Sequence, residues 1–249
     1  MSNLANKVTV IIGGSTGIGL ASAKEFIGAG ASVVLFARSK KDLDAAAKEL
    51  GHKSHVITGD VTKLSDLERL YNETKTKFGG IDVLFINSAH GKLIPIADTS
   101  ESIYDEMIDL NLKGPYFALQ KAIGYLNNGA SVIITTSWIN QIGFGGTSLL
   151  SASKAALRSL TRVASAELIG KGIRVNAISP GAIGTPFWGK LGLSDEALKG
   201  AAEALTKQVP LKRFGEPHEI AKAVLFLASS DSSYIVGSEI SVDGGLNQL

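Results

Sequence analysis

The sequence predicts an α/β fold in which a doubly wound, parallel sheet of seven strands carries helices on both faces. The first observation is a set of seven short runs rich in β-branched residues, at positions 8–12, 33–36, 55–58, 81–86, 131–136, 173–178 and 239–242. The second is that stretches with helical spacing separate most of these runs, because strand–helix–strand repeats pair in parallel through right-handed crossovers. The third is composition, since 45% hydrophobic and 19% charged residues suit a large buried sheet. We expect a single domain over residues 1–249.

Composition also limits the possible partners and sites. The chain contains no cysteine, which excludes disulfides and thiolate metal sites, and we expect no bound metal. Its 25 basic and 23 acidic residues are scattered along the chain, which argues against nucleic acid or an anionic membrane as a partner. No run approaches the roughly 20 apolar residues of a membrane span, and the N-terminus has no apolar run of signal-peptide length. We therefore expect a cytoplasmic protein.

The first strand leads directly into a glycine-rich loop and then into a stretch with helical spacing. Glycines at such a turn let backbone N–H groups approach a pyrophosphate at a helix N-terminus. The spacing is GxxxGxG instead of the common GxGxxG, and a tight turn alone would also need glycine. The position after the first strand nevertheless favours a Rossmann-type dinucleotide site built from Gly13, Ser15, Thr16, Gly17, Ile18 and Gly19.

The end of the second strand indicates which dinucleotide is bound. In dinucleotide folds an acidic residue here meets the ribose 2′-OH, whereas an arginine accommodates a 2′-phosphate. The strand ends in Phe36-Ala37-Arg38-Ser39, with no acid. Arg38 and Ser39 therefore favour NADP(H), because a guanidinium forms bidentate pairs with phosphate. The alternative is that Arg38 is a solvated loop charge.

From here the chain resembles the short-chain dehydrogenase/reductase family along essentially its whole length, with the motifs in the expected order. Asn87-Ser88-Ala89 follows the fourth strand and resembles the family's Asn-Ala-Gly, and Asp243-Gly244-Gly245 resembles its C-terminal signature. The resemblance implies cofactor contacts at Asp60, Val61, Asn87, Ala89, Lys154, Pro180, Gly181, Ile183 and Thr185. It also implies catalytic roles for Asn111, Ser137 and Lys154.

The family's catalytic tyrosine is absent. The resemblance places a Tyr-x-x-x-Lys motif 13 residues after the serine; counting from Ser137 reaches Leu150, with the lysine present as Lys154. In the family the tyrosine protonates the alkoxide that develops when a carbonyl is reduced. Leucine has no proton to donate, and a general acid is typically worth ~10²–10⁴-fold. We expect an NADPH-dependent oxidoreductase that reduces a ketone or other carbonyl to an alcohol, slowed by Leu150.

Two other interpretations stay open. The chain could be a non-catalytic NADP(H)-binding protein that acts as a sensor or a structural subunit. Alternatively, another acid could replace the tyrosine, such as His90 on the loop after the fourth strand, since imidazole titrates in the useful range. A lone histidine at that position is also compatible with a pocket wall.

A long segment at 185–214 interrupts the alternation of strands and helices. It follows a strand end, where such sheets bind ligands, so we expect a mobile substrate lid. An apolar pocket for a ketone or similar compound is favoured, although simple lid packing would use the same residues, Ile94, Ile139, Ile142, Phe144, Phe187, Trp188, Leu191, Leu193 and Leu205. A 3-oxoacyl thioester remains open as the substrate. The resemblance also implies a homotetramer, with the helix at 151–170 and the strand near Ile240 at interfaces.

Overall fold

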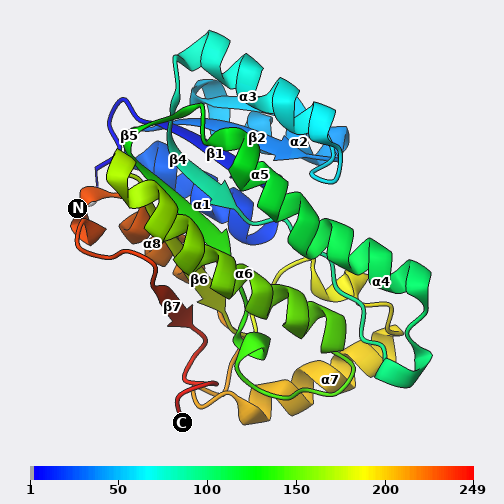
Figure 1. Ribbon diagram of the computed structural model, residues 1–249. Helices are drawn as coiled ribbons and strands as arrows, with labels where there is room; N and C mark the ends of the chain where they lie inside the picture. The colour runs from blue at the N-terminus through cyan, green and yellow to red at the C-terminus, as the bar shows by residue number, and fades with distance from the viewer. Residues whose placement is uncertain (1–2) are drawn as a thin grey trace.

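The computed structural model describes residues 3–249 and contains one sheet of seven parallel strands (Figure 1). The strands are β1 (Val8–Ile12), β2 (Ser32–Ala37), β3 (Ser54–Thr58), β4 (Ile81–Ile86), β5 (Leu126–Thr135), β6 (Arg174–Pro180) and β7 (Glu239–Val242). Their order across the sheet is β3-β2-β1-β4-β5-β6-β7. The expected doubly wound α/β fold is confirmed.

Helices cover both faces of the sheet. They are α1 (Gly17–Gly28), α2 (Lys40–Leu50), α3 (Leu64–Phe78), α4 (Glu101–Ile108), α5 (Gly114–Ala122), α6 (Ser148–Leu168), α7 (Asp195–Gln208) and α8 (Pro217–Ala228). Buried residues of α1, α2 and α8 pack on one face, and those of α3, α5 and α6 pack on the other. A π-helical turn, Asp109–Lys113, joins α4 and α5 into one continuous rod along the front of Figure 1.

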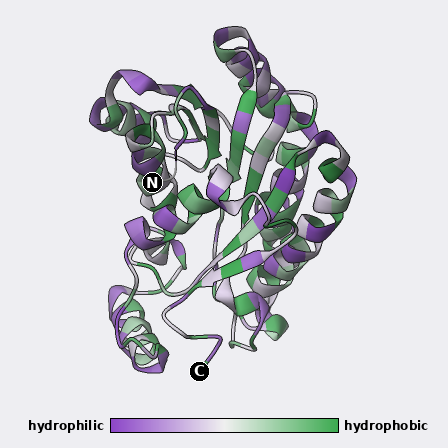
Figure 2. Ribbon diagram, turned by 90° about the vertical axis from the view of Figure 1, so that its left-hand side faces the viewer, coloured by the Kyte–Doolittle hydropathy of each residue, from purple (hydrophilic) through white to green (hydrophobic). Residues whose placement is uncertain are grey.

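The direction of side chains along each strand explains the two layers. Along β1, Val10 and Ile12 belong to the core under α3, α5 and α6, whereas Ile11 belongs to the core under α1, α2 and α8. Successive strand residues point to opposite faces. Because both faces are covered, each strand needs apolar residues in succession, and hydrophobic residues accordingly gather on the central strands (Figure 2).

The strand order reverses between β1 and β4. Strand β1 pairs with β2 on one side and with β4 on the other, so the connections that leave these two strands run in opposite directions. Such a reversal leaves a crevice at the carboxyl ends of the strands. The loops that follow β1, β2, β4, β5 and β6 surround this crevice.

Strand β5 departs most from its predicted range. Strand β5 begins at Leu126, five residues before position 131, because Leu126 pairs with Ile81 ahead of an irregularity in the register. Gly129, inside this extension, has a φ of 79°, in the left-handed region that favours glycine. The extension lies at the amino end of β5, away from the crevice. Among the described residues, no helix has the length and apolar character to cross a membrane.

Candidate active site

A pocket of about 360 Å³ lies at the carboxyl ends of the strands. Most of the residues assigned to the cofactor line it, namely Gly13, Ser15, Thr16, Gly17, Ile18, Arg38, Ser39, Val61, Asn87, Ala89, Lys154, Pro180, Gly181, Ile183 and Thr185. Ser137 and Leu150 line it as well. Three assigned residues, Gly19, Asp60 and Asn111, are not among the lining residues.

The glycine-rich loop has the backbone geometry of an anion site. Gly13 and Gly17 have φ values of 80° and 54°, which disfavour any other residue. A Cβ on Gly19 would lie 2.1 Å from the Gly13 carbonyl oxygen, so Gly19 packs the loop behind the pocket. The Thr16 side chain does not cap α1, and the N–H groups of the first helical turn remain available for a phosphate.

The loop after β2 and the first turn of α2 place Arg38 and the Asp42 carboxylate at the pocket. Arg38 lines the pocket and has no hydrogen bond or ion pair with another described residue. The Ser39 hydroxyl accepts a hydrogen bond from the Asp42 N–H at 3.2 Å and so caps α2. Asp42 itself lines the pocket, a contact that the sequence reasoning missed because Asp42 lies within a helix. The unpaired guanidinium fits a phosphate group.

Asp60 faces its own turn. Its carboxylate accepts hydrogen bonds from the Thr62 N–H at 3.0 Å and from the Thr62 hydroxyl at 2.9 Å. The neighbours Gly59 and Val61 do line the pocket. Asp60 therefore shapes the turn that presents these two residues.

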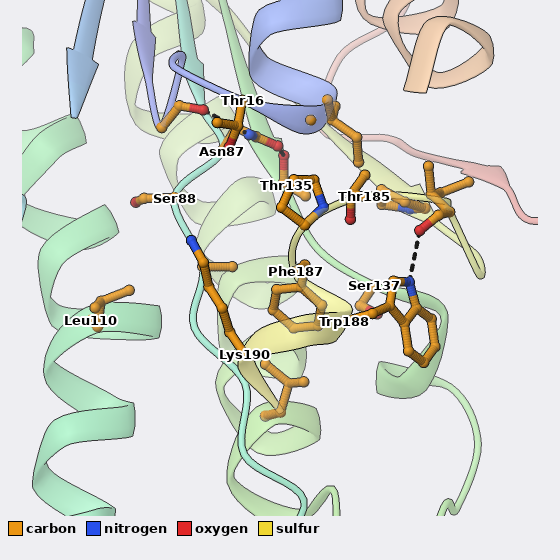
Figure 3. Close-up of a pocket in the computed structure, with 18 of the residues that line it drawn as sticks. Thr16, Asn87, Ser88, Leu110, Thr135, Ser137, Thr185, Phe187, Trp188 and Lys190 are labelled. Carbon is orange, nitrogen blue, oxygen red and sulfur yellow. Dashed lines mark hydrogen bonds between the residues drawn. The ribbon is translucent and has the colours of Figure 1, made fainter. Parts of the chain in front are cut away.

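Asn87 ties three strand ends together beneath the pocket. Its side-chain amide donates a hydrogen bond to the Gly13 carbonyl at 3.2 Å, and its carbonyl oxygen accepts one from the Thr135 hydroxyl at 3.1 Å (Figure 3). These bonds fix the ends of β1, β4 and β5 relative to one another. The adjacent Ser88 hydroxyl is buried without a hydrogen-bond partner among the described residues.

Asn111 acts from outside the pocket. It lies in the π-helical turn and is fully buried. Its side chain accepts a hydrogen bond from the His90 N–H and donates one to the His90 carbonyl, both at 2.8 Å. Asn111 thus holds the loop after β4, which carries Asn87, Ser88 and Ala89. Nothing in the residue pattern marked this π turn, a feature frequent at functional sites.

Lys154 is a buried cation at the centre of the site. It lies on α6 with 3% of its surface exposed, and its Nζ donates a hydrogen bond to the Thr135 carbonyl at 2.8 Å. Burial lowers the pKa of Lys154 to about 8, because desolvation disfavours the charged form. Ser137, which follows β5, has a hydroxyl with no hydrogen-bond partner among the described residues.

Leu150 places an apolar side chain at the position where the sequence predicts that a catalytic tyrosine is missing. It lies one turn before Lys154 on α6 and is 7% exposed. It packs in a cluster that includes Trp138, Ile139 and Leu205. In the described chain no tyrosine or histidine lines the pocket.

His90 does not supply the missing acid in this arrangement. Its ring is outside the set of lining residues, and its Nε2 lies 3.4 Å from a carboxylate oxygen of Glu106. Burial is the main cause that lowers the pKa of His90, with the Glu106 charge acting in the opposite direction. His90 serves the loop through its backbone bonds to Asn111.

The far wall comes from the 185–214 segment. Phe187, Trp188, Lys190, Leu191 and Leu205 line the pocket, and the Trp188 indole N–H donates a hydrogen bond to the Ile183 carbonyl at 2.7 Å (Figure 3). Ile139 and Phe144 also line it, whereas Ile94, Ile142 and Leu193 do not. Figure 3 shows the Lys190 side chain extending toward Ser88. Sequence reasoning missed Lys190 and Trp138, which no motif marks.

Comparison with known proteins decides the family. A family model described as Enoyl-(Acyl carrier protein) reductase matches residues 13–247. The chain is 41% identical to Oxidoreductase asL5 of Sarocladium schorii, covering 100% of this chain and 99% of that protein. It is 35% identical to 3-oxoacyl-[acyl-carrier-protein] reductase FabG of Thermotoga maritima, covering 98% of each. The chain belongs to the short-chain dehydrogenase/reductase family.

Solved structures agree with this assignment. The chain superposes with a TM-score of 0.93 on a short-chain dehydrogenase/reductase from Brucella melitensis, at 33% identity over 100% of this chain and 99% of that one. Levodione reductase gives a TM-score of 0.93 at 31% identity, over 98% of this chain and 99% of that one. The family consists of oxidoreductases that use nicotinamide cofactors, and the anion loop and free Arg38 of this chain fit such a group.

Proposed function

We propose that this chain is an NADPH-dependent reductase of carbonyl compounds in which Leu150 slows the reduction of ordinary ketones. The observation that supports it is one pocket that joins an anion-binding loop to Ser137 and Lys154, with Leu150 packed where the acid would stand. Arg38 favours NADPH over NADH, because its guanidinium lines the pocket without a hydrogen bond or ion pair to the described part of the chain and can pair with a 2′-phosphate.

Each group in the pocket has a role in this proposal. Gly13 to Gly19 and the first turn of α1 bind the pyrophosphate, with Val61 and Ala89 beside the adenosine and ribose. Pro180, Gly181, Ile183 and Thr185 hold the carboxamide end, and Lys154 holds the neighbouring ribose. When bound, the nicotinamide supplies a hydride. Ser137 donates a hydrogen bond to the carbonyl oxygen, and Asn111 and Asn87 position the loop after β4.

The substrate side of the pocket favours an apolar carbonyl compound. Its wall consists of aromatic and aliphatic side chains from three segments, including Trp138, Phe144, Phe187 and Trp188. In this proposal the 185–214 segment is a lid on the single catalytic domain, and its opening admits the substrate.

The decisive experiment compares NADPH oxidation by the parent and by Leu150→Tyr with a panel of aryl and alkyl ketones. Fluorescence titration first establishes that both proteins bind NADPH more tightly than NADH. We expect Leu150→Tyr to gain on the order of 10²-fold or more in kcat/KM, since it restores a general acid. Rapid ketone turnover by the parent would contradict the role given to Leu150.

A second candidate is a non-catalytic NADP(H)-binding protein. The observation that favours it is that Leu150 packs into a cluster with Met107, Trp138 and Leu205. This is the packing expected of an ordinary core residue. It predicts that both proteins bind NADPH and that neither oxidises it with any acceptor.

We propose a homotetramer as the assembly. Val163 and Ile169, in and just after α6, are 52% and 46% exposed, and Tyr116 on α5 is 48% exposed, so α5 and α6 leave apolar side chains uncovered. A small-angle scattering profile that matches the calculated curve of a monomer would contradict this assembly.

A further inference from the structure

Resting on the proposed function, we propose that the substrate of this site is a conjugated dienone of the quinone-methide type, whose reduction leaves a phenolate and needs no proton donor. Three observations carry the proposal: an apolar residue in the donor position, a buried cation with unused hydrogen-bond donors, and an aromatic wall.

The first observation concerns the acids available in the pocket. Its charged lining residues are Arg38, Asp42, Lys154 and Lys190. Arg38 and Asp42 belong to the loop and helix after β2, and Figure 3 shows the Lys190 side chain extending toward Ser88. Leu150 itself packs in an apolar cluster with Met107, Trp138 and Leu205. In the described chain no tyrosine, histidine or glutamate lines the pocket, so the ammonium groups of Lys154 and Lys190 are the acidic groups left near Ser137.

The acidity of the product distinguishes the reduction of a ketone from the reduction of a quinone methide. Reduction of an isolated ketone places the charge on an alkoxide, whose conjugate acid is about as weak as water, with a pKa of about 15.7. A phenol has a pKa of about 10. A phenolate therefore forms without simultaneous proton transfer far more readily than an alkoxide does.

The second observation is the state of Lys154. Its ammonium has three N–H donors, and a single hydrogen bond, to Thr135, engages it within the described chain. It has no carboxylate partner there. A buried positive charge of this kind stabilises an anion strongly, because the surroundings have a low dielectric constant. Ser137 also lines the pocket, and its hydroxyl has no hydrogen-bond partner among the described residues.

The third observation is the wall. Trp138 and Phe144 meet edge to face with ring centroids 5.6 Å apart, and Phe187 and Trp188 line the pocket from the lid segment. Aromatic rings pack well against planar, conjugated substrates.

The reaction balances without an acid. Hydride from the nicotinamide of NADPH, which is thereby oxidised, forms a C–H bond at the exocyclic carbon of the quinone methide. The π pair of the exocyclic bond moves into the ring, which becomes aromatic, and the π pair of the carbonyl bond moves onto oxygen. With one Lys154 N–H donor on Thr135 and one on the ribose, the third N–H and the Ser137 hydroxyl hold the resulting phenolate, which takes a proton from water after release.

Fuchsone and benzophenone form a matched pair of probes, since hydride adds to a diphenyl-substituted carbon in both. We expect the parent to reduce fuchsone at least ~10²-fold faster than benzophenone, with products identified by chromatography. Leu150→Tyr should shrink this ratio by a similar factor, because it restores the acid that benzophenone needs. Leu150→Phe is the control for ring size, and it should leave the ratio high.

A second readout is independent of cofactor and turnover. We would titrate 2-naphthol by absorbance in the presence of the parent and of Lys154→Met, without NADPH. The parent should lower the pKa of bound 2-naphthol by about one unit or more, and Lys154→Met should not.

The outcomes separate the two proposals. Equal rates with fuchsone and benzophenone in the parent, or an unshifted 2-naphthol pKa, would overturn the phenolate inference while ketone turnover by Leu150→Tyr still supports the proposed reductase. If the parent and Leu150→Tyr both bind NADPH but oxidise it with none of the acceptors, the proposed reductase function is wrong. The inference about the substrate, which rests on that function, is then wrong as well.

Discussion

Two buried cations lie at opposite ends of the sheet, and their surroundings differ. At the amino end of β6, the Arg174 guanidinium donates four hydrogen bonds of 2.9–3.1 Å to carbonyl oxygens of Leu227, Ser229 and Ser232 and to the Ser232 hydroxyl. At the carboxyl end of β5, the Lys154 ammonium donates one hydrogen bond to a strand carbonyl at 2.8 Å. Both residues are buried, at 9% and 3% exposed.

The difference supports the proposal that one end of the sheet serves stability and the other serves binding. The acceptors around Arg174 belong to the end of α8 and the turn after it, so the guanidinium fastens that segment to β6. Lys154 instead keeps unused donors inside the protein, which is costly unless a ligand completes its shell. A buried cation with four hydrogen bonds to the protein stabilises the fold, whereas we expect a buried cation with a single hydrogen bond to bind a ligand.

The largest expected effect tests the stabilising end. Arg174→Leu should lower the free energy of unfolding by about 4 kcal/mol, because it removes four charged hydrogen bonds and leaves their buried acceptors without donors. Urea denaturation measures this. Arg69→Leu is the matched control, since the Arg69 side chain is 43% exposed and should contribute less than about 1 kcal/mol. Equal losses of unfolding free energy in Arg174→Leu and Arg69→Leu would contradict the stabilising role given to Arg174.

Lys154→Met should act in the opposite sense. Lowering the pKa of this lysine to about 8 corresponds to a cost of about 3 kcal/mol for burying the charge. Replacement by a neutral side chain removes that cost and loses one hydrogen bond, so we expect a net gain of about 2 kcal/mol in the free energy of unfolding. Denaturation at pH 7 tests it, with exposed Lys171→Met as the control. A destabilised Lys154→Met would mean that the lysine supports the fold.

Arg38 extends the comparison to a third cation, which has no hydrogen bond or ion pair with residues 3–249. Arg38→Ser should weaken NADPH binding by about tenfold and leave NADH binding nearly unchanged, because the lost interaction is with the 2′-phosphate. Fluorescence titration with both cofactors gives the two dissociation constants. The same loss of affinity for NADPH and NADH would show that Arg38 does not bind the 2′-phosphate. Asp42→Asn should strengthen NADPH binding, since it removes a like charge.

The sequence predicted the fold, and most of the residues that it assigns to a cofactor line one pocket, although their roles stay predictions. Seven apolar runs and the Gly13–Gly19 spacing are local features, and backbone geometry follows from them directly. The roles of Asp42, Lys190 and Asn111 were not readable, because each depends on contacts between segments distant in sequence. Asn111 lies outside the pocket owing to the π turn, which no residue pattern specifies. Leu150 was identified by register alone, although its packing partners came only from the tertiary structure.

The smallest expected effect follows the protonation of Lys154. Its pKa is lowered in the folded state to about 8, against about 10.4 in the unfolded chain. Between these values the unfolded chain binds more protons, so this group makes the free energy of unfolding rise with pH, by about 1 kcal/mol from pH 8 to pH 9. Lys154→Met should lack this rise, and its advantage over the parent should shrink correspondingly. A constant difference between the two proteins across that range would mean that Lys154 titrates normally and that burial does not weaken its charge.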